Sequence, residues 1–365
     1  MNETITNRQI AFVIFGVVLG YGILGLGKNE AEVAGTTGWL IMLITTIIMT
    51  IIVYIISYLG YVHANKTIYE YSTLLVGKKI TAVFMIIYFV YYFLLGSFII
   101  RIASEGIKHS ILINTPRWAI SFGFCIIIYY AIVKGFSTIV RLCEIFGIII
   151  IIASCLIIIA MFGHGDLINL KPFFIPLEIK SFLKAMYALI LPFAGVEIIV
   201  VIPFDKKKNN KKVIRYTTLI TLFIGLLYIG FAEACINVLG IDRIIMYKDS
   251  LLVAIRKIEI ENLQFLERLD GLFLIAWIMA IYTTVILEIY ASVYFISKIV
   301  KKNNINKIAF VIVFMAFIIS CWNFTFKEVE QYLTYVTSLN LLTTVAIPII
   351  LLIITKVKKY DKKNI

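Results

Sequence analysis

The segment Gly20-Tyr21-Gly22-Ile23-Leu24-Gly25-Leu26-Gly27 lies inside the first long apolar run of this 365-residue chain. Four glycines in eight residues are unusual for a membrane-spanning helix, because glycine loosens the helix and lets another group approach the main chain. The segment therefore predicts an interruption of the first helix near Gly20. The alternative interpretation is close helix packing, which the spacing of Gly16 and Gly20 also fits. The candidate ligand-binding residues of this segment are Gly20, Tyr21, Gly22 and Ile23.

The stretch Leu191-Pro192-Phe193-Ala194-Gly195-Val196-Glu197 lies in a later apolar run. Proline removes a main-chain donor and a glycine follows three residues later, so this stretch predicts a second interruption. Gly20 and Pro192 each lie about ten residues, or about 15 Å, from the start of their own run. The candidate ligand-binding residues of this stretch are Leu191, Pro192, Phe193, Ala194, Gly195 and Glu197.

Apolar runs of membrane-spanning length dominate the rest of the chain. Hydrophobic residues make up 61% of the sequence and charged residues 15%, and a hydrocarbon core of about 30 Å takes about 20 helical residues to cross. A helix also satisfies its own backbone hydrogen bonds in lipid. The pattern predicts an all-α membrane protein with about ten transmembrane helices, at residues 9–27, 38–61, 80–103, 118–135, 141–163, 181–203, 213–238, 269–298, 307–325 and 333–355.

The two interruptions fall in the first and sixth of these spans, which is the first position of each half when the spans divide five plus five. Spans one and six would enter the membrane from opposite sides, so both interruptions would meet near its middle. This arrangement predicts an inverted-repeat transporter fold in which broken helices expose main-chain groups to a substrate. The free donors suit a carboxylate, and the free carbonyls suit an ammonium group or a cation.

The charge pattern predicts the orientation. The formal net charge is +13, but the basic residues form short clusters between apolar runs, which indicates membrane topology and contact with lipid headgroups rather than nucleic-acid binding. Cytoplasmic loops of membrane proteins carry an excess of Lys and Arg, and this rule places both termini in the cytoplasm. The prediction is one transmembrane domain over residues 1–365, with a first repeat at 1–163, a second repeat at 181–355 and a basic cytoplasmic tail at 356–365.

Cysteine and histidine give no sign of a metal, a cofactor or catalysis. The five cysteines are scattered singly without a CxxC spacing, and the three histidines fall in or beside predicted loops. We therefore expect no metal and no cofactor. A membrane enzyme such as an acyltransferase or intramembrane hydrolase is one possible function. No Ser, His and Asp set lies at one depth, so the chain is not expected to be an enzyme.

Several polar side chains are expected at the depth of the interruptions. Tyr91 and Tyr92 lie deep in the third span, and Thr283 and Thr284 lie near the middle of the eighth, so all four are candidate ligand-binding residues. The alternatives are plain helix contacts for the tyrosines and hydroxyl bonds back to their own helix for the threonines. A charge at this depth costs at least roughly 2.5 kcal/mol, so a glutamate there needs a partner or a task. The glutamates expected inside spans are Glu197, Glu233 and Glu288.

The connection from Gly240 to Arg268 has alternating charges and an apolar stripe. It predicts one or two amphipathic helices over the outer mouth, as a gating lid or as a solvated cap.

Several motifs together resemble the endospore germination permeases, which form the B subunit of nutrient germinant receptors and are a branch of the amino acid, polyamine and organocation transporter superfamily. The resemblance runs over most of the chain. Relatives usually have proline after the first break, where Gly27 and Lys28 stand here, so this break depends on glycine. The motifs are Ile5-Thr6-Asn7-Arg8-Gln9 leading into Gly20-Tyr21-Gly22-Ile23-Leu24, Lys66-Thr67-Ile68-Tyr69-Glu70-Tyr71-Ser72 with Gly77-Lys78, Gly135 with Arg141, Glu144, Ile145 and Phe146, Asn169-Leu170-Lys171-Pro172, and Gly195-Val196-Glu197 running into Pro203-Phe204.

The resemblance implies a LeuT-like 5+5 inverted repeat with broken helices 1 and 6 that binds a small-molecule nutrient, with an amino acid expected. It also implies a complex with an A-type membrane subunit and a C-type lipoprotein, in the inner membrane of a dormant spore. Two functions use the same pocket. The first is a germinant-sensing subunit, which needs only differential affinity between two states. The second is an ion-coupled secondary amino acid transporter.

Overall fold

The computed structural model describes residues 5–205, 211–258, 269–300 and 304–360, and every regular element in them is helical. The first half contains α1 (Asn7–Gly22), α2 (Leu26–Ala34), α3 (Gly38–Val62), α4 (Ile68–Val76), α5 (Lys78–Ser110), α6 (Arg117–Lys134) and α7 (Phe136–His164). The second half contains α8 (Ile179–Ala188), α9 (Lys212–Leu239), α10 (Ile241–Ile244), α11 (Ser250–Arg256), α12 (Leu269–Val300), α13 (Ile305–Cys321), α14 (Phe326–Asn340) and α15 (Ile347–Val357).

Seven helical segments of the described chain are long and apolar enough to cross a membrane, and Ile305–Cys321 is a shorter apolar helix. The chain is therefore an integral membrane protein, as its composition predicts. The ten-helix count stays a prediction, because α1 and α8 are too short to qualify alone. The seven segments are Leu26–Val62, Lys78–Ser110, Arg117–Lys134, Phe136–His164, Lys212–Leu239, Leu269–Val300 and Gln331–Val357.

The glycine-rich first run and the proline-containing sixth run have different local structures. In the first, α1 ends at Gly22 and α2 begins at Leu26, so the turn lies slightly beyond Gly20, where the sequence pattern placed it. In the sixth, α8 ends at Ala188 and two 3₁₀ turns follow, at Leu191–Phe193 and Val196–Val201. Gly195 joins these turns with φ +95°, a conformation that favours glycine. The predicted span 181–203 is thus only partly α-helical.

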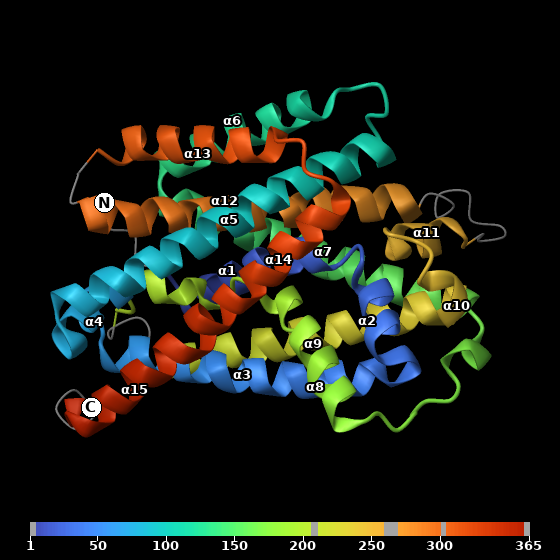
Figure 1. The fold of residues 1–365 in the computed structure, drawn as a ribbon, viewed down its shortest axis with the longest axis horizontal. Coiled ribbons are helices and arrows are strands. Elements are labelled where there is room, and N and C mark those ends of the chain that lie inside the picture. Colours follow the sequence, from blue (N-terminus) through green and yellow to red (C-terminus); the bar gives the residue numbers. More distant parts are fainter. Residues whose placement is uncertain (1–4, 206–210, 259–268, 301–303, 361–365) are drawn as a thin grey trace.

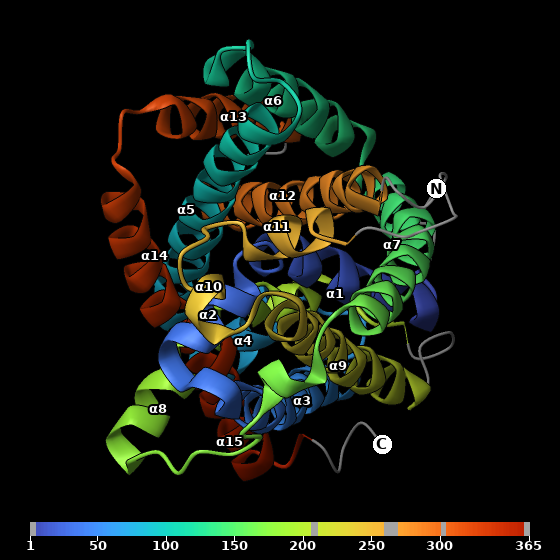
Figure 2. The ribbon, with the colours of Figure 1, turned by 90° about the vertical axis from the view of Figure 1, so that its right-hand side faces the viewer.

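The long helices surround α1. Figure 1 shows α3, α5, α9, α12 and α13 running along the length of the molecule, with α4 at one end and α10 and α11 at the other. Figure 2, which looks along the helices, places α1 in the interior with α12 on one side and α9 on another. Helices α6 and α13 pack together at the periphery. Helix α1, which leads into the first interruption, therefore lies inside the bundle.

The connection predicted to cover the outer mouth contains two short helices, α10 and α11. The main-chain N–H of Leu251 donates to the carbonyl of Leu24, 3.2 Å away, so this connection contacts the turn after α1. Residues 259–268 of the predicted cover lie outside the described residues.

A buried histidine joins α3, α4 and α15 at the end of the bundle where α4 lies. His63 follows the last residue of α3, its Nε2 lies 3.1 Å from the Thr355 hydroxyl, and its ring stacks on Tyr71 with centroids 5.1 Å apart. Only 3% of the His63 surface is exposed. Burial, with a smaller contribution from Lys66, lowers the pKa of His63 from 6.5 to about 4. The folded protein therefore favours the neutral ring.

Stability is expected to fall as the pH drops below 6.5, because the unfolded chain takes up a proton on His63 and the folded chain does not. Between pH 7 and 5.5 this single group is expected to remove about 1 kcal/mol of the free energy of unfolding. Thermal unfolding in detergent at several pH values measures the effect. His63→Gln should flatten the pH dependence, and His164→Gln, at an exposed histidine, should leave it unchanged. A dependence unaltered by His63→Gln would contradict this assignment.

Candidate functional site

The two interruptions lie against each other in the interior. A Cβ placed on Gly22 would be 3.1 Å from the Cβ of Pro192. The hydroxyl of Tyr228, on α9, lies 2.9 Å from the carbonyl oxygens of both Val18 and Pro192 and donates a hydrogen bond shared between them. Tyr228 is fully buried. One side chain thus bridges the main chain of α1, just before the first interruption, and the 3₁₀ turn of the second.

Helix α12 contacts the opposite face of α1 through its two adjacent threonines. The Thr283 and Thr284 hydroxyls donate to the carbonyl of Gly16 at 3.0 and 2.9 Å, and the N–H of Gly20 donates to the Thr284 hydroxyl at 3.2 Å. Both hydroxyls also reach the carbonyl of Ala280, one turn back on their own helix. The threonines therefore bond within α12 and also hold α1 beside it.

A chain of hydrogen bonds connects Gly195 to Glu197 through α5 and α14. The N–H of Gly195 donates to the Tyr91 hydroxyl at 3.0 Å, and the Asn340 amide donates to the same oxygen at 2.7 Å. The Asn340 amide also donates to the Thr344 hydroxyl at 3.1 Å, which donates to Oε2 of Glu197 at 2.9 Å. Thr344 lies in a π-helical turn, Leu341–Ala346, and such turns are frequent at functional sites.

Several polar atoms around this chain are buried and have no hydrogen-bond partner among the described residues. They are both carboxylate oxygens of Glu288, Oδ1 of Asn340 and, close to each other, the Tyr92 hydroxyl and Oε1 of Glu197. Glu288 belongs to the same group, because a Cβ on Gly195 would lie 2.7 Å from its Oε1. An unpaired buried polar group costs about 1–3 kcal/mol, so this concentration of open donors and acceptors is expected where a polar ligand completes the bonding.

The structure brings most of the predicted site residues together, with two qualifications. Ile23 faces an apolar cavity of about 10 Å³ that Ile150, Phe231 and Trp277 also line, away from the polar group around Glu197. Phe193 and Ala194 are buried, whereas Leu191 is partly exposed. Phe193 packs edge-on against Tyr228 with ring centroids 5.5 Å apart. Ligand contact by any of these residues stays a prediction.

Sequence patterns missed four polar residues of the interior. Tyr228, Asn340 and Thr344 lie in predicted spans but are not among the candidate ligand-binding residues. An asparagine inside an apolar run could have indicated a buried polar role. Glu30, just after the first predicted span, is the fourth. Its surface is 0% exposed, and both its carboxylate oxygens lack a hydrogen-bond partner among the described residues.

Comparison with known sequences gives a consistent family. A sequence model of the family described as Spore germination protein matches residues 4–329. Spore germination protein YndE of Bacillus subtilis (strain 168) is 29% identical over 363 residues, covering 98% of this chain and 98% of that protein. Spore germination protein KB of the same organism is 26% identical, covering 84% of this chain and 81% of that protein. Spore germination protein GerLB of Bacillus cereus is 23% identical, covering 100% and 97%.

Solved structures show the same fold at low sequence identity. MhsT in complex with L-phenylalanine has a TM-score of 0.72 at 11% identity, covering 97% of this chain and 90% of MhsT. Mhp1, a nucleobase-cation-symport-1 family transporter with bromovinylhydantoin bound, has a TM-score of 0.67 at 12% identity, covering 92% of this chain and 75% of Mhp1. The chain therefore has the all-helical fold of LeuT-like transporters.

Proposed function

Since this chain belongs to the spore germination protein family, we propose that it is the subunit of a spore germination receptor that senses a nutrient, an amino acid, at the middle of the membrane. The observation that carries the proposal is the group of buried, unpartnered polar atoms of Tyr92, Glu197, Glu288 and Asn340 beside the two interruptions. The ligand would occupy the space between α1, the two 3₁₀ turns, α5 and α12, after these elements separate.

The chemistry of this group suits a zwitterion. Glu197 and Glu288 offer carboxylate oxygens to an ammonium group. The carbonyls of Val18 and Pro192, which now accept from Tyr228, would offer further acceptors once that hydrogen bond is broken. The N–H groups beside the interruptions, such as that of Gly195, would serve a carboxylate once they leave their present partner. The residues proposed to contact the ligand are Gly20, Tyr21, Gly22, Ile23, Tyr91, Tyr92, Leu191, Pro192, Phe193, Ala194, Gly195, Glu197, Thr283 and Thr284.

The proposed architecture follows from the same premise. The ten spans would form a 5+5 inverted repeat, with α1–α2 as broken helix 1 and α8 with its 3₁₀ turns as broken helix 6. Both termini would lie in the cytoplasm. The complex would include an A-type membrane subunit and a C-type lipoprotein in the spore inner membrane, and the relatives named as spore germination proteins support this setting.

Sensing requires two conformations that differ in affinity for the nutrient. The hydrogen bonds from Tyr228 to both irregular segments favour the closed arrangement described here. A nutrient that satisfies more of the open polar groups in a second arrangement would shift the population toward it. The partner subunits would then convert this shift into germination.

Thermal stabilisation of the purified full-length chain by individual L-amino acids tests the proposal, because a ligand of the folded state raises the apparent stability. At least one amino acid is expected to raise the unfolding temperature. Glu197→Gln removes a carboxylate and should weaken the apparent affinity about tenfold or more, the loss typical of a charge-assisted hydrogen bond. Glu178→Gln, at an exposed position, is the control. An unchanged dose response in Glu197→Gln would remove this carboxylate from the site.

The alternative function is ion-coupled secondary transport of an amino acid. The observation that favours it is the fold, because the solved structures that match include a nucleobase-cation-symport-1 family transporter and a Na⁺-coupled sialic acid symporter. Uptake of labelled amino acid by the chain alone in liposomes, dependent on a Na⁺ or H⁺ gradient, would support transport. Binding without uptake, together with loss of germination on deletion, would support sensing.

A further inference from the structure

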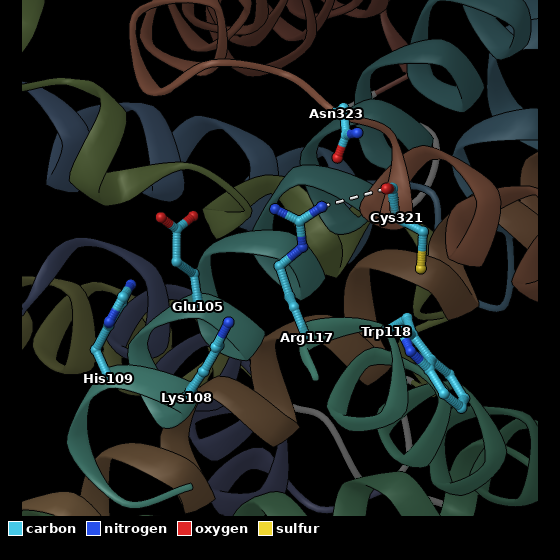
Figure 3. Close-up of a pocket in the computed structure, with 7 residues that line it drawn as sticks. All are labelled: Glu105, Lys108, His109, Arg117, Trp118, Cys321 and Asn323. Atoms are coloured by element: carbon cyan, nitrogen blue, oxygen red, sulfur yellow. Dashed lines mark hydrogen bonds between the residues drawn. The ribbon is translucent and has the colours of Figure 1, made fainter. Parts of the chain in front are cut away.

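A polar cavity lies at the end of the bundle opposite α4. It has a volume of about 330 Å³ and is lined by residues from the end of α5, the start of α6 and the segment after α13. This volume lies within the range of small-molecule sites. Figure 3 shows Glu105, Lys108 and Arg117 projecting into the same space, with Asn323 above them. The lining residues are Glu105, Lys108, His109, Arg117, Trp118, Cys321 and Asn323.

The cavity carries excess positive charge. Lys108 and Arg117 face Glu105, and that single carboxylate is already paired with Lys248 at 3.7 Å. Lys108 has no hydrogen bond or ion pair within the described part of the chain. Arg117 donates to the carbonyl of Cys321 at 3.2 Å, while its Nε is buried without a hydrogen-bond partner among the described residues. The cavity thus offers the Lys108 ammonium and the positive charge of Arg117 to an anion.

The start of α6 adds a second feature that favours an anion. This helix begins at Arg117 and has 18 residues. The first N–H groups of a helix have no partner within it, and its dipole places positive partial charge at that end. The cations and the helix end therefore act on the same volume.

The surface beside the cavity is apolar and matches the acyl region of a bilayer. Trp118 lines the cavity and is 59% exposed, and Phe122 and Ile126 follow it at four-residue spacing on α6 with 51% and 53% exposed. A helix of 18 residues is about 27 Å long, close to the hydrocarbon thickness, so Arg117 and Trp118 would lie at the level of the headgroups. Tryptophan is enriched at that level.

From this juxtaposition we infer that the cavity binds the phosphate group of an anionic phospholipid, with the acyl chains running along the exposed face of α6. The phosphate would lie between Lys108 and Arg117, and Asn323 would contact the polar part of the headgroup. A soluble phosphate would use the same donors but would gain nothing from Trp118, Phe122 and Ile126. The continuity of charged cavity and apolar track favours the lipid.

The loop between α13 and α14 connects the residues of this cavity to helix α14. Arg101 donates to the carbonyls of Trp322 and Phe324, and Arg117 donates to that of Cys321. A phosphate that engages Arg117 would therefore act on a segment leading directly into α14, which carries Asn340 of the central hydrogen-bond chain. This site is separate from the proposed nutrient site and does not depend on it.

Thermal unfolding of the purified full-length chain in a neutral detergent tests the inference with short-chain lipids as probes. Dihexanoyl phosphatidylglycerol is expected to raise the unfolding temperature more than equal concentrations of dihexanoyl phosphatidylcholine or sodium phosphate. Lys108→Gln should weaken its apparent affinity about fivefold, since a partly exposed ion pair contributes up to about 1 kcal/mol. Arg117→Gln should do the same where it folds, and Lys180→Gln, at an exposed position on α8, should have no effect.

Three outcomes would overturn the inference. Equal stabilisation by the two lipids would show that the headgroup charge is irrelevant. An equal effect of sodium phosphate would assign the cavity to a free anion instead of a lipid. Unchanged phosphatidylglycerol affinity in Lys108→Gln would place lipid binding elsewhere, and this variant removes no hydrogen bond or ion pair within the described chain.

Discussion

Gly20→Ala is expected to destabilise the folded protein by about 3 kcal/mol, at the upper end of the range for overpacking. A Cβ at Gly20 would lie 2.5 Å from Oγ1 of Thr284 and 2.6 Å from the carbonyl oxygen of Ala280. The second atom belongs to the main chain of α12, so no side-chain rotation relieves the clash. Helix α1 would have to move away from α12, which would also stretch the Thr284 bonds to Gly16 and Gly20.

The matched control is Gly123→Ala, in a helix of the same membrane protein. No atom lies within 4 Å of the position that a Cβ would take at Gly123. This change should be neutral or slightly stabilising, because alanine favours a helix over glycine by up to about 1 kcal/mol. Thermal unfolding in one detergent compares the two variants. Equal unfolding temperatures for both would mean that α1 and α12 are not in the close contact described here.

Tyr91→Phe is expected to destabilise the protein by about 2 kcal/mol and to abolish the nutrient response. The lost hydroxyl accepts hydrogen bonds from the N–H of Gly195 and from the Asn340 amide, at 3.0 and 2.7 Å. Without it the Gly195 N–H stays buried and unpaired, at a cost of about 1–3 kcal/mol. Asn340 keeps its bond to Thr344 but loses the contact that fixes its orientation.

A tyrosine of similar chemistry provides the control for this change. The Tyr282 hydroxyl makes a long hydrogen bond of 3.4 Å to the carbonyl of Ile127, outside the polar group around Glu197. Tyr282→Phe should change stability by less than about 0.5 kcal/mol and should leave the amino acid dose response intact. Both properties are measured by thermal unfolding with and without ligand. A Tyr91→Phe protein that responds like the parent would exclude this hydroxyl from nutrient recognition.

The long apolar runs explain why most of the fold was predictable from sequence. A membrane-spanning helix must be apolar across the thickness of the bilayer, so its ends can be located from one continuous apolar run of the sequence. The predicted span at 38–61 corresponds to Gly38–Val62 and that at 213–238 to Lys212–Leu239. The family was predictable because its motifs lie close together in sequence, and the match over residues 4–329 confirms it. The form of the sixth run, with two 3₁₀ turns, was not encoded in its composition.

The candidate site was predictable only where one residue type carries its own signal. Glycine and proline favour an irregular main chain by their own chemistry, which is why the sequence predicts interruptions at Gly20, Pro192 and Gly195. The roles of Tyr228 and Asn340 depend on which atoms of distant helices they meet, and no local pattern encodes that. The burial of Glu30 depends in the same way on α2, the helix that follows the first interruption and holds this side chain inside the fold.

The shared hydrogen bond of Tyr228 has a mechanical consequence. The Tyr228 hydroxyl links the main chain of Val18 in the first half of the molecule to that of Pro192 in the second. Neither segment can move away from the other without breaking this link. A ligand that takes one of these carbonyls leaves the hydroxyl bonded to the other alone, so the link between the two halves is lost. The two segments could then move independently of each other. Tyr228 would therefore hold the two halves together until its hydrogen bond is broken.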